Sequence, residues 1–268
     1  DEVATSRRQL AKELRDAVAR EEFELHYQPQ VALESGCVVG IKARLRWWHP
    51  QRGMLAAGEF IDVAEETGLI VQLGEWVFET ACRQTVEWQR AGYPELFVTV
   101  NVSPVEIRRG RVVQQVQRAL ERSGLAPCHL EIELTESVGI ADAEAYVATL
   151  AELKELGISI AIDDFGTGYS SLSSLKTFPI SKVKIDQTFT RDIVVNPDDA
   201  AIVQAVIAMA HHLQLEVVSK GVESERQAGF LRRCRCDIAQ GFLFGAPMQA
   251  ADFKELLDVS AGRLLPVR

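Results

Sequence analysis

Short hydrophobic runs alternate with longer amphipathic stretches along most of this chain. The runs are dense in Val, Ile and Leu rather than cleanly alternating, which is typical of β-strands that are buried on both faces. The sequence therefore predicts eight strands: Phe23–Val31, Val38–Trp47, Phe97–Ser103, His129–Thr135, Ile158–Asp163, Lys182–Asp186, Leu215–Lys220 and Asp237–Phe244.

Helical periodicity separates nearly all of these strands. The predicted helices are Ala57–Thr67, Gly74–Ala91, Arg111–Ser123, Asp142–Leu156, Leu172–Thr177, Asp198–His212, Ser224–Arg233 and Ala250–Asp258. Gly92, Gly124 and Gly157 lie just past three of them, where a left-handed residue often ends a helix. Eight strands that alternate with helices predict an α/β fold of the TIM (β/α)8 barrel type.

The first two strands break this alternation. The turn Glu34–Ser35–Gly36 between them is too short for a crossover helix. They are therefore expected to pair antiparallel, so that the first strand of the barrel is reversed.

A further helix, roughly Ser6–Glu21, is predicted before the first strand, because Ser6 and Gln9 resemble a capping box. It belongs either to the barrel or to a connection from an upstream domain. Since the chain begins with Asp1, we interpret residues 1–21 as a linker helix and residues 22–268 as one barrel domain.

Composition and charge narrow the function classes. The net charge of −9 argues against a nucleic-acid polymer as partner, although a small dianion can still bind in a locally positive pocket. No hydrophobic run approaches the roughly 18 residues of a membrane-spanning helix, so no membrane insertion is expected. The five cysteines form no Cys-x-x-Cys pair, which favours reduced thiols and a cytoplasmic location.

Polar residues mark the C-terminal ends of strands three to eight. In a β/α barrel this rim is where sites are built, because the loops converge there over the axis. A single acid at a strand end has an ordinary explanation as a helix cap, but polar groups at six consecutive strands indicate a site. Two further acids, Asp164 and Glu223, lie next to or just after these strand ends. Together the residues are typical of a divalent-metal phosphodiester site: Asn101, Glu133, Asp163, Asp164, Lys184, Glu223 and Gln240.

These segments resemble the EAL domain family, whose active members hydrolyse the bacterial second messenger cyclic di-GMP. The resemblance runs from about Glu22 to Phe253, and its longest motif is Asp163–Leu172. The shorter motifs are Tyr27-Gln28-Pro29, Leu45-Arg46-Trp47, Ala64-Glu65-Glu66-Thr67-Gly68, Val100-Asn101-Val102-Ser103, Glu133-Leu134-Thr135-Glu136-Ser137, Lys184-Ile185-Asp186, Gly221-Val222-Glu223 and Gln240-Gly241. The family fold is a β/α barrel with a reversed first strand, which agrees with the strand pattern above.

The resemblance implies a site for two metal ions. In active relatives the family-naming glutamate, together with the residues that match Asn101, Glu133 and Asp163, holds one metal. The paired aspartates, here Asp163 and Asp164, bridge to a second metal, and the lysine that matches Lys184 helps to position the attacking water.

The resemblance also implies contacts to the nucleotide. Residues that match Gln28 and Arg46 contact the ligand, and those around Gln240 and Phe242 hold a guanine. Glu136, with the loop that follows Asp163, matches the segment that links the metal site to a dimer contact.

Two lysines depart from the family pattern. Lys42 stands in place of the naming glutamate, and Lys220 stands in place of the first acid of a Glu-Gly-Val-Glu motif. An ammonium has no lone pair for a metal, and at about 4 Å it would repel each unit of positive charge by roughly 4 kcal/mol. Arg44 replaces an apolar residue, and it either stacks on a guanine or fills the base pocket.

The sequence is therefore interpreted as a catalytically inactive cyclic di-GMP receptor that needs no divalent metal, similar to the receptor-type EAL domains of FimX-like proteins. That similarity implies a PilZ-type adaptor, a role in type IV pili and twitching motility, and possible homodimers through the barrel. Two alternatives stay open, a weak metal-dependent phosphodiesterase and a scaffold that binds no nucleotide. The expected ligand contacts are Gln28, Arg46, Asn101, Glu133, Asp163, Asp164, Lys184, Lys220, Glu223, Gln240 and Phe242.

Overall fold

The two longest strands come first in the chain and pair as an antiparallel hairpin. β1 (Phe23–Ala32) and β2 (Val38–His49) are joined by a tight turn in which the Gly36 N–H donates to Ala32 O (2.8 Å). Gly36 has a φ of 71°, a conformation that favours glycine. The predicted reversal of the first strand is confirmed.

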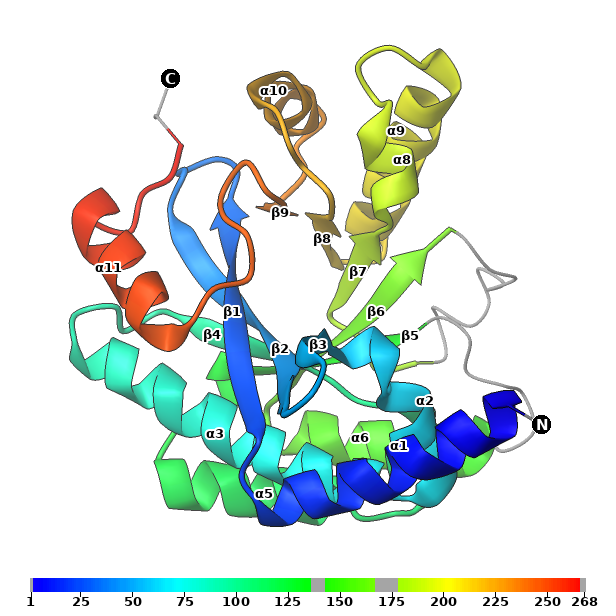
Figure 1. Cartoon of the computed structure of the whole chain (residues 1–268). Coiled ribbons are helices and arrows are strands. Elements are labelled where there is room, and N and C mark those ends of the chain that lie inside the picture. The colour runs from blue at the N-terminus through cyan, green and yellow to red at the C-terminus, as the bar shows by residue number, and fades with distance from the viewer. Residues whose placement is uncertain (1, 136–142, 167–177, 266–268) are drawn as a thin grey trace.

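The remaining strands complete a closed barrel (Figure 1). The computed structural model describes residues 2–135, 143–166 and 178–265. β2 continues through parallel neighbours to the last strand, which pairs antiparallel with β1 and closes the ring. A short additional strand, β3 (Gly53–Ala56), pairs with the far end of β2. The strands of the ring after β2 are β4 (Phe97–Asn101), β5 (Leu130–Thr135), β6 (Ser159–Phe165), β7 (Lys182–Ile185), β8 (Glu216–Ser219) and β9 (Ile238–Gln240).

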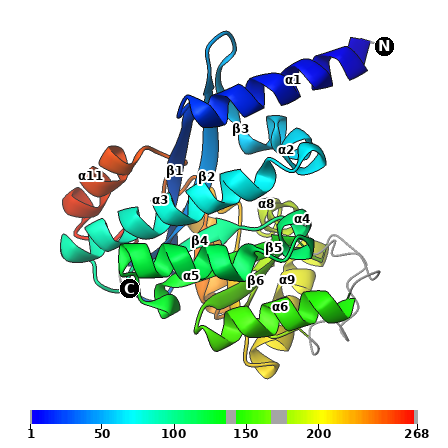
Figure 2. The ribbon, with the colours of Figure 1, turned by 90° about the horizontal axis from the view of Figure 1, so that it is seen from below.

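Helices surround this ring, and Figure 2 shows α3 and α5 side by side. Most of the predicted helices are confirmed to within a few residues at each end, while predicted helix Leu172–Thr177 lies outside the described residues. The α-helices are α1 (Glu2–Ala19), α2 (Ile61–Thr67), α3 (Ile70–Arg90), α4 (Pro104–Arg108), α5 (Val112–Ser123), α6 (Ala143–Glu155), α8 (Gln187–Arg191), α9 (Pro197–His212), α10 (Glu225–Arg233) and α11 (Ala250–Ser260), and short 3-10 helices cover Ala57–Glu59 and Pro127–His129.

Two short helices were not predicted. α4 begins after Ser103, whose side chain accepts from the Val105 N–H (3.0 Å), and α8 begins after Asp186, whose side chain accepts from the Thr188 N–H (2.9 Å). Each has five residues, which is too few for helical periodicity to show.

The predicted last strand is too long. β9 ends at Gln240, where the chain bends. Gly241 lies against the backbone of Val222, since a Cβ at Gly241 would be 2.1 Å from Val222 O. The Phe244 N–H donates back to Gly241 O (3.1 Å), so that the segment after β9 leaves the barrel.

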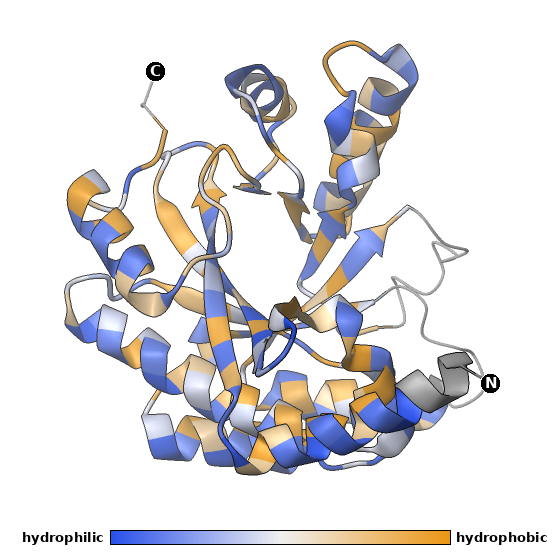
Figure 3. Ribbon diagram, in the orientation of Figure 1, coloured by the Kyte–Doolittle hydropathy of each residue, from blue (hydrophilic) through white to orange (hydrophobic). Residues whose placement is uncertain are grey.

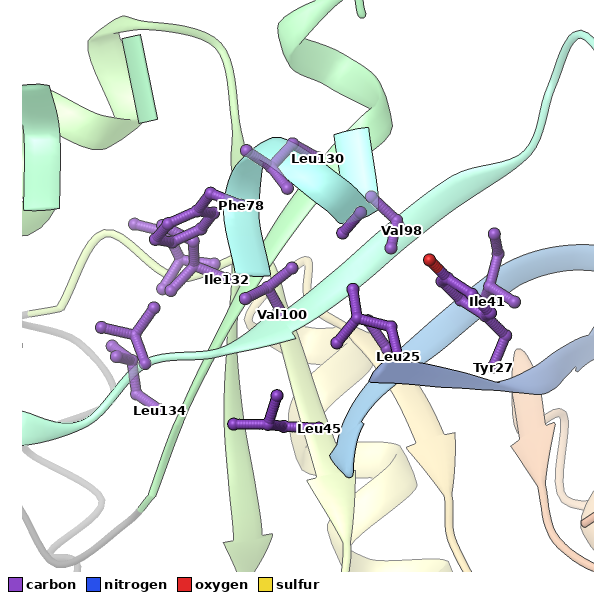
Figure 4. Packing of buried hydrophobic residues seen from close by; sticks show 14 of the residues in the cluster. Leu25, Tyr27, Ile41, Leu45, Phe78, Val98, Val100, Leu130, Ile132 and Leu134 are labelled. Atoms are coloured by element: carbon purple, nitrogen blue, oxygen red, sulfur yellow. The ribbon is translucent and has the colours of Figure 1, made fainter. Parts of the chain in front are cut away.

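The core lies between the strands and the surrounding helices. Figure 3 shows hydrophobic residues along the strands, and Figure 4 shows Phe78 of α3 close to side chains of the barrel strands. Phe78, Val98 and Ile132 are fully buried. Burial of such side chains contributes about 1.5–3 kcal/mol each.

α1 packs against α2, and its apolar side is buried at Leu14 and Ala17. The helix is therefore in contact with the barrel, while the division into residues 1–21 and 22–268 stays a prediction. No helix of the described residues has the length and hydrophobicity needed to cross a bilayer.

Candidate functional site

A chain of ion pairs links side chains of β2, β5, β6 and β7 and of Lys220, which follows β8. Its centre is Lys184 of β7, which is completely buried and lies 2.6 Å from Glu133 Oε2 and 2.8 Å from Glu131 Oε1. Lys182, two residues earlier on the same strand, pairs with Glu131 Oε2 (2.9 Å). Parallel pairing of β5, β6 and β7 brings these residues together.

Lys42 and Lys220 complete this chain of ion pairs from either side. Lys42 of β2 pairs with Glu133 Oε1 and lies 3.7 Å from Asp163 Oδ2. Lys220, which follows β8, lies 2.5 Å from Asp163 Oδ1, pairs with Asp164, and lies 3.7 Å from Asp186 Oδ2. We call Glu133, Asp163, Asp164 and Asp186, with Lys42, Lys184 and Lys220, the carboxylate cluster.

Burial and neighbouring charges shift the titration of this cluster. Burial raises the pKa of Asp163 to about 6, and the adjacent Glu133 adds to the rise. Burial also opposes ionisation of Glu133, but Lys184 and Lys42 hold its pKa well below the usual value. Burial lowers the pKa of Lys42, while Glu133 and Asp163 favour its charged form. For Lys220 burial acts in the same direction, but Asp163 and Asp164 outweigh it and raise its pKa.

A cavity of about 630 Å³ opens beside the cluster. This volume lies within the range of small-molecule sites. Its lining includes Glu133 and Asp163 as well as Arg44, Arg46 and Asn101. Two guanidinium groups and two carboxylates of the cluster therefore line the same cavity.

Arg44 and Arg46 are both partly exposed. Arg44 Nε donates to Gln28 Oε1 (3.1 Å), and Arg46 Nη1 donates to Leu45 O (3.0 Å). Since each guanidinium has five N–H donors, both side chains keep donors for a ligand.

Gln28 and Gln240 bind each other behind the lining of the cavity, where Gln28 also accepts the hydrogen bond from Arg44. Gln240 Nε2 donates to Gln28 Oε1 (2.9 Å), and Gln28 Nε2 donates to Gly245 O (3.2 Å). Both side chains are buried where β1 meets β9. They support closure of the barrel in this structure.

Glu223 and Phe242 are at the surface. Phe242 is 65% exposed, which leaves its ring accessible to a flat ligand. Glu223 is exposed, and its backbone N–H donates to Gln227 Oε1 (2.8 Å). Among the ion pairs of the described residues Glu223 takes no part, and Glu136 lies outside the described residues.

Three acids near the site were not singled out from the sequence. Glu131 and Asp186 pair with lysines of the barrel. Asp186 stands in the motif Lys184-Ile185-Asp186, whereas Glu131 lies near the start of its strand and carries no such signal. Glu106 lines the cavity, its Oε2 accepts from the Ser103 N–H (2.8 Å), and burial raises its pKa to about 8. The spacing Ser103-x-x-Glu106 is a capping box, a pattern that the sequence does show.

The carboxylate cluster as arranged here does not fit a divalent metal ion. Each of its four carboxylates lies within ion-pair distance of an ammonium group. Within residues 2–135, 143–166 and 178–265, no three His, Cys, Asp or Glu side chains are grouped so as to hold a metal. A metal at these carboxylates requires movement of the lysines.

Comparisons with known proteins identify relatives over most of the chain. It is 46% identical over 242 residues to the bifunctional diguanylate cyclase/cyclic di-GMP phosphodiesterase MucR of Pseudomonas aeruginosa, covering 90% of this chain and 35% of that protein. It is 43% identical to the cyclic di-GMP phosphodiesterase NbdA of the same species, covering 95% of this chain and 32% of that protein. The chain thus spans about a third of the length of these relatives.

Solved structures agree with this relationship. A MucR phosphodiesterase structure in complex with cyclic di-GMP has a TM-score of 0.86 at 46% identity, covering 91% of this chain and 99% of that one. A FimX EAL domain from Xanthomonas citri has a TM-score of 0.83 at 22% identity, and the match covers 93% of this chain and 97% of that one. At that identity the FimX likeness shows the fold alone.

The expectation of an inactive receptor is wrong in the light of these relatives, since MucR and NbdA are named as phosphodiesterases. The expectation that no divalent metal is required is contradicted as well, because the family resemblance attaches two-metal hydrolysis to active members. Lys42 and Lys220 were expected to exclude a metal ion from the site. Each ammonium ends a flexible four-carbon stem, so it can move away from the carboxylates.

The family itself follows from a match to most of the sequence. The family model described as the EAL domain matches residues 11–247. The barrel with its reversed first strand and the carboxylates at its C-terminal rim agree with that match. This chain belongs to the EAL domain family.

Proposed function

We propose that this domain is a cyclic di-GMP phosphodiesterase. The observation that supports this most directly is the cavity in which Glu133 and Asp163 lie next to Arg44 and Arg46. Relatives with more than 40% identity are named for this activity, and one is solved with cyclic di-GMP bound. The substrate carries two phosphates, which match the guanidinium groups of the wall.

The chain's own residues can be given roles in this reaction. Arg44 and Arg46 bind phosphate oxygens and fix the position of the phosphodiester. Asp163, with its pKa of about 6, is largely ionised at pH 7 and can accept a proton at its carboxylate. Lys184 holds Glu133 in place through a 2.6 Å ion pair. A divalent metal held by Glu133 and Asp163 after movement of the lysines would supply Lewis-acid chemistry to phosphodiester hydrolysis.

The test is turnover of cyclic di-GMP with Mn²⁺ or Mg²⁺ at pH 8–9, with the linear dinucleotide followed by chromatography. We expect product in proportion to protein, and loss of at least 100-fold in Asp163→Asn, the usual size of an acid–base contribution. An inactive wild-type domain that is folded and binds cyclic di-GMP would contradict the proposal. Equal rates in wild type and Asp163→Asn would also contradict it, because they would point to a contaminant.

The finer expectations about partners stay predictions. A PilZ-type adaptor and a homodimer through the barrel are inferred from the family resemblance, and a cytoplasmic location is inferred from the cysteine pattern. Pull-down with a PilZ protein, light scattering of the purified domain and cell fractionation test these three separately.

A further inference from the structure

We infer that Lys42 and Lys220 are built-in competitors of divalent metal at the carboxylate cluster. Their ammonium groups hold the acids together while no metal is bound, and they lower the affinity for metal. This inference deepens the proposed phosphodiesterase function and rests on it for its biological meaning. It concerns metal affinity, and it assigns a role to two residues that the proposed chemistry does not use.

The first support is the position of each ammonium among the acids. Lys42 Nζ reaches Glu133 from β2 and lies 3.7 Å from Asp163. Lys220 Nζ approaches Asp163 (2.5 Å) and Asp164 from β8. Asp163 thus faces an ammonium with each of its two oxygens, so a cation that uses this carboxylate must displace at least one lysine.

The second support is the charge balance of the cluster. Its four carboxylates face three ammonium groups, which leaves a formal charge of −1. Without Lys42 and Lys220 the same side chains would have a formal charge of −3. Because attraction to a divalent ion grows with the charge of its site, removal of the two lysines increases metal affinity.

The third support is burial. Lys42 is 2% exposed, and the side chain of Lys220 is 15% exposed. Charges at such depth are screened by salt much less than surface charges are. Their effect on a metal ion is therefore large, and it should persist at physiological ionic strength.

The experiment titrates Mn²⁺ into the 268-residue chain by calorimetry at pH 7.5. The variants are Lys42→Met, Lys220→Met and the double variant, because Met keeps the length of the stem without its charge. The matched control is Lys182→Met, which removes another buried lysine of the barrel, one that pairs with Glu131 and Glu216 outside the cluster. Circular dichroism checks that each variant is folded.

We expect the double variant to bind Mn²⁺ at least tenfold more tightly than wild type, an effect of about 1.4 kcal/mol. The affinity of each single variant should lie between those of wild type and the double variant. Lys182→Met should gain less than either single variant, because Lys182 pairs with none of the four carboxylates of the cluster. If the double variant does not fold, Lys220→Met decides the question, since its side chain is the more exposed of the two. A folded variant without a gain in affinity, or an equal gain in Lys182→Met, would overturn the inference.

Turnover of cyclic di-GMP measured on the same samples separates this inference from the proposed function. Tighter Mn²⁺ binding with no turnover in any sample would sink the phosphodiesterase proposal and leave the competition intact. Turnover by wild type with equal Mn²⁺ affinity in all samples would overturn the competition between the lysines and the metal and would support the phosphodiesterase proposal.

Discussion

The basic residues of β2 differ in role according to their depth in the barrel. Lys42, Arg44 and Arg46 alternate along the strand, so their side chains share one face. Lys42 is buried among the acids, whereas Arg44 and Arg46 are partly exposed in the wall of the cavity. On one strand, Lys42 neutralises buried carboxylate charge, while Arg44 and Arg46 are available to bind a ligand.

For Arg46 this position predicts a loss of nucleotide affinity on truncation. Arg46→Ala should weaken cyclic di-GMP binding about 10- to 100-fold, because a hydrogen bond to a charged group contributes about 1.5–3 kcal/mol. Calorimetry measures the dissociation constant. Arg191→Ala, which removes an exposed arginine paired with Asp192, is the control and should bind like wild type. An unchanged affinity in Arg46→Ala would place the phosphates elsewhere.

Glu106 predicts a pH-dependent stability. Its pKa rises from an ordinary 4.5 to about 8 because it is buried. The fold thus favours the neutral form of Glu106. Its contribution to the free energy of unfolding is therefore complete below pH 4.5 and is lost as the pH rises through 8. Glu106→Gln stays neutral, and between pH 5 and 9 its stability should rise relative to wild type by a few kcal/mol, at 1.36 kcal/mol per pKa unit.

Urea unfolding at several pH values measures this difference between Glu106→Gln and wild type. The control is Glu121→Gln, at an exposed position of α5, which should follow wild type at every pH. A Glu106→Gln curve parallel to that of wild type would show that Glu106 is ionised in the folded protein.

Among the elements, two helices have glycines with opposite roles, one just after α5 and one inside α10. Gly124 follows α5 with a φ of 74°, and a Cβ there would meet nothing within 4 Å. Gly229 lies inside α10, and a Cβ there would have only ordinary contact with Arg233 Nη1 (3.7 Å). The first glycine is required by backbone conformation alone, and the second weakens its helix.

The same substitution should therefore have opposite effects at the two glycines. Gly124→Ala should lower the free energy of unfolding by about 1 kcal/mol, the cost of a left-handed conformation for alanine. Gly229→Ala should raise it by about 0.5–1 kcal/mol. Urea unfolding of the two variants measures both effects, and equal signs would contradict this account of helix ends.

At the scale of the whole molecule, the C-terminal segment fastens the reversed strand. Tyr27 of β1 exchanges backbone hydrogen bonds with Met248 (2.7 and 3.0 Å), and α11 then packs beside β1 (Figure 1). The ring of Phe253 lies 4.9 Å from that of Trp88, which in turn lies 4.8 Å from Tyr27. Three elements distant in sequence meet at this aromatic cluster.

Loss of that contact should weaken the whole barrel. Phe253→Ala is expected to lower the free energy of unfolding by about 3–5 kcal/mol, because Phe253 is fully buried. The control, Phe242→Ala, removes the same atoms from a ring that is 65% exposed and should change stability by less than about 0.5 kcal/mol. Urea unfolding measures both changes. A loss of stability in Phe253→Ala as small as that in Phe242→Ala would show that α11 is not an integral part of the fold.

Much of the fold was predictable because its signals are local. Dense hydrophobic runs between amphipathic stretches predicted the eight strands of the ring, and the three-residue turn before Cys37 predicted the reversal of β1. The short elements β3, α4 and α8 were missed, since each has too few residues for periodicity to show. The end of β9 was also missed. Gly241 approaches Val222 there, and a contact between residues this far apart in the sequence leaves no mark in the local strand pattern.

For the site, the sequence by itself determined which charged groups reach the rim, because strand ends and family motifs fix Asn101, Glu133, Asp163 and Lys184 in order. Only the tertiary structure decided which of them meet. Parallel register brings Lys42 to Glu133 and Lys220 to Asp163, whereas Gln28 and Gln240 bind each other at the barrel closure. Partner choice depends on distances of a few ångströms between distant segments, and Coulomb and hydrogen-bond energies change steeply over that range.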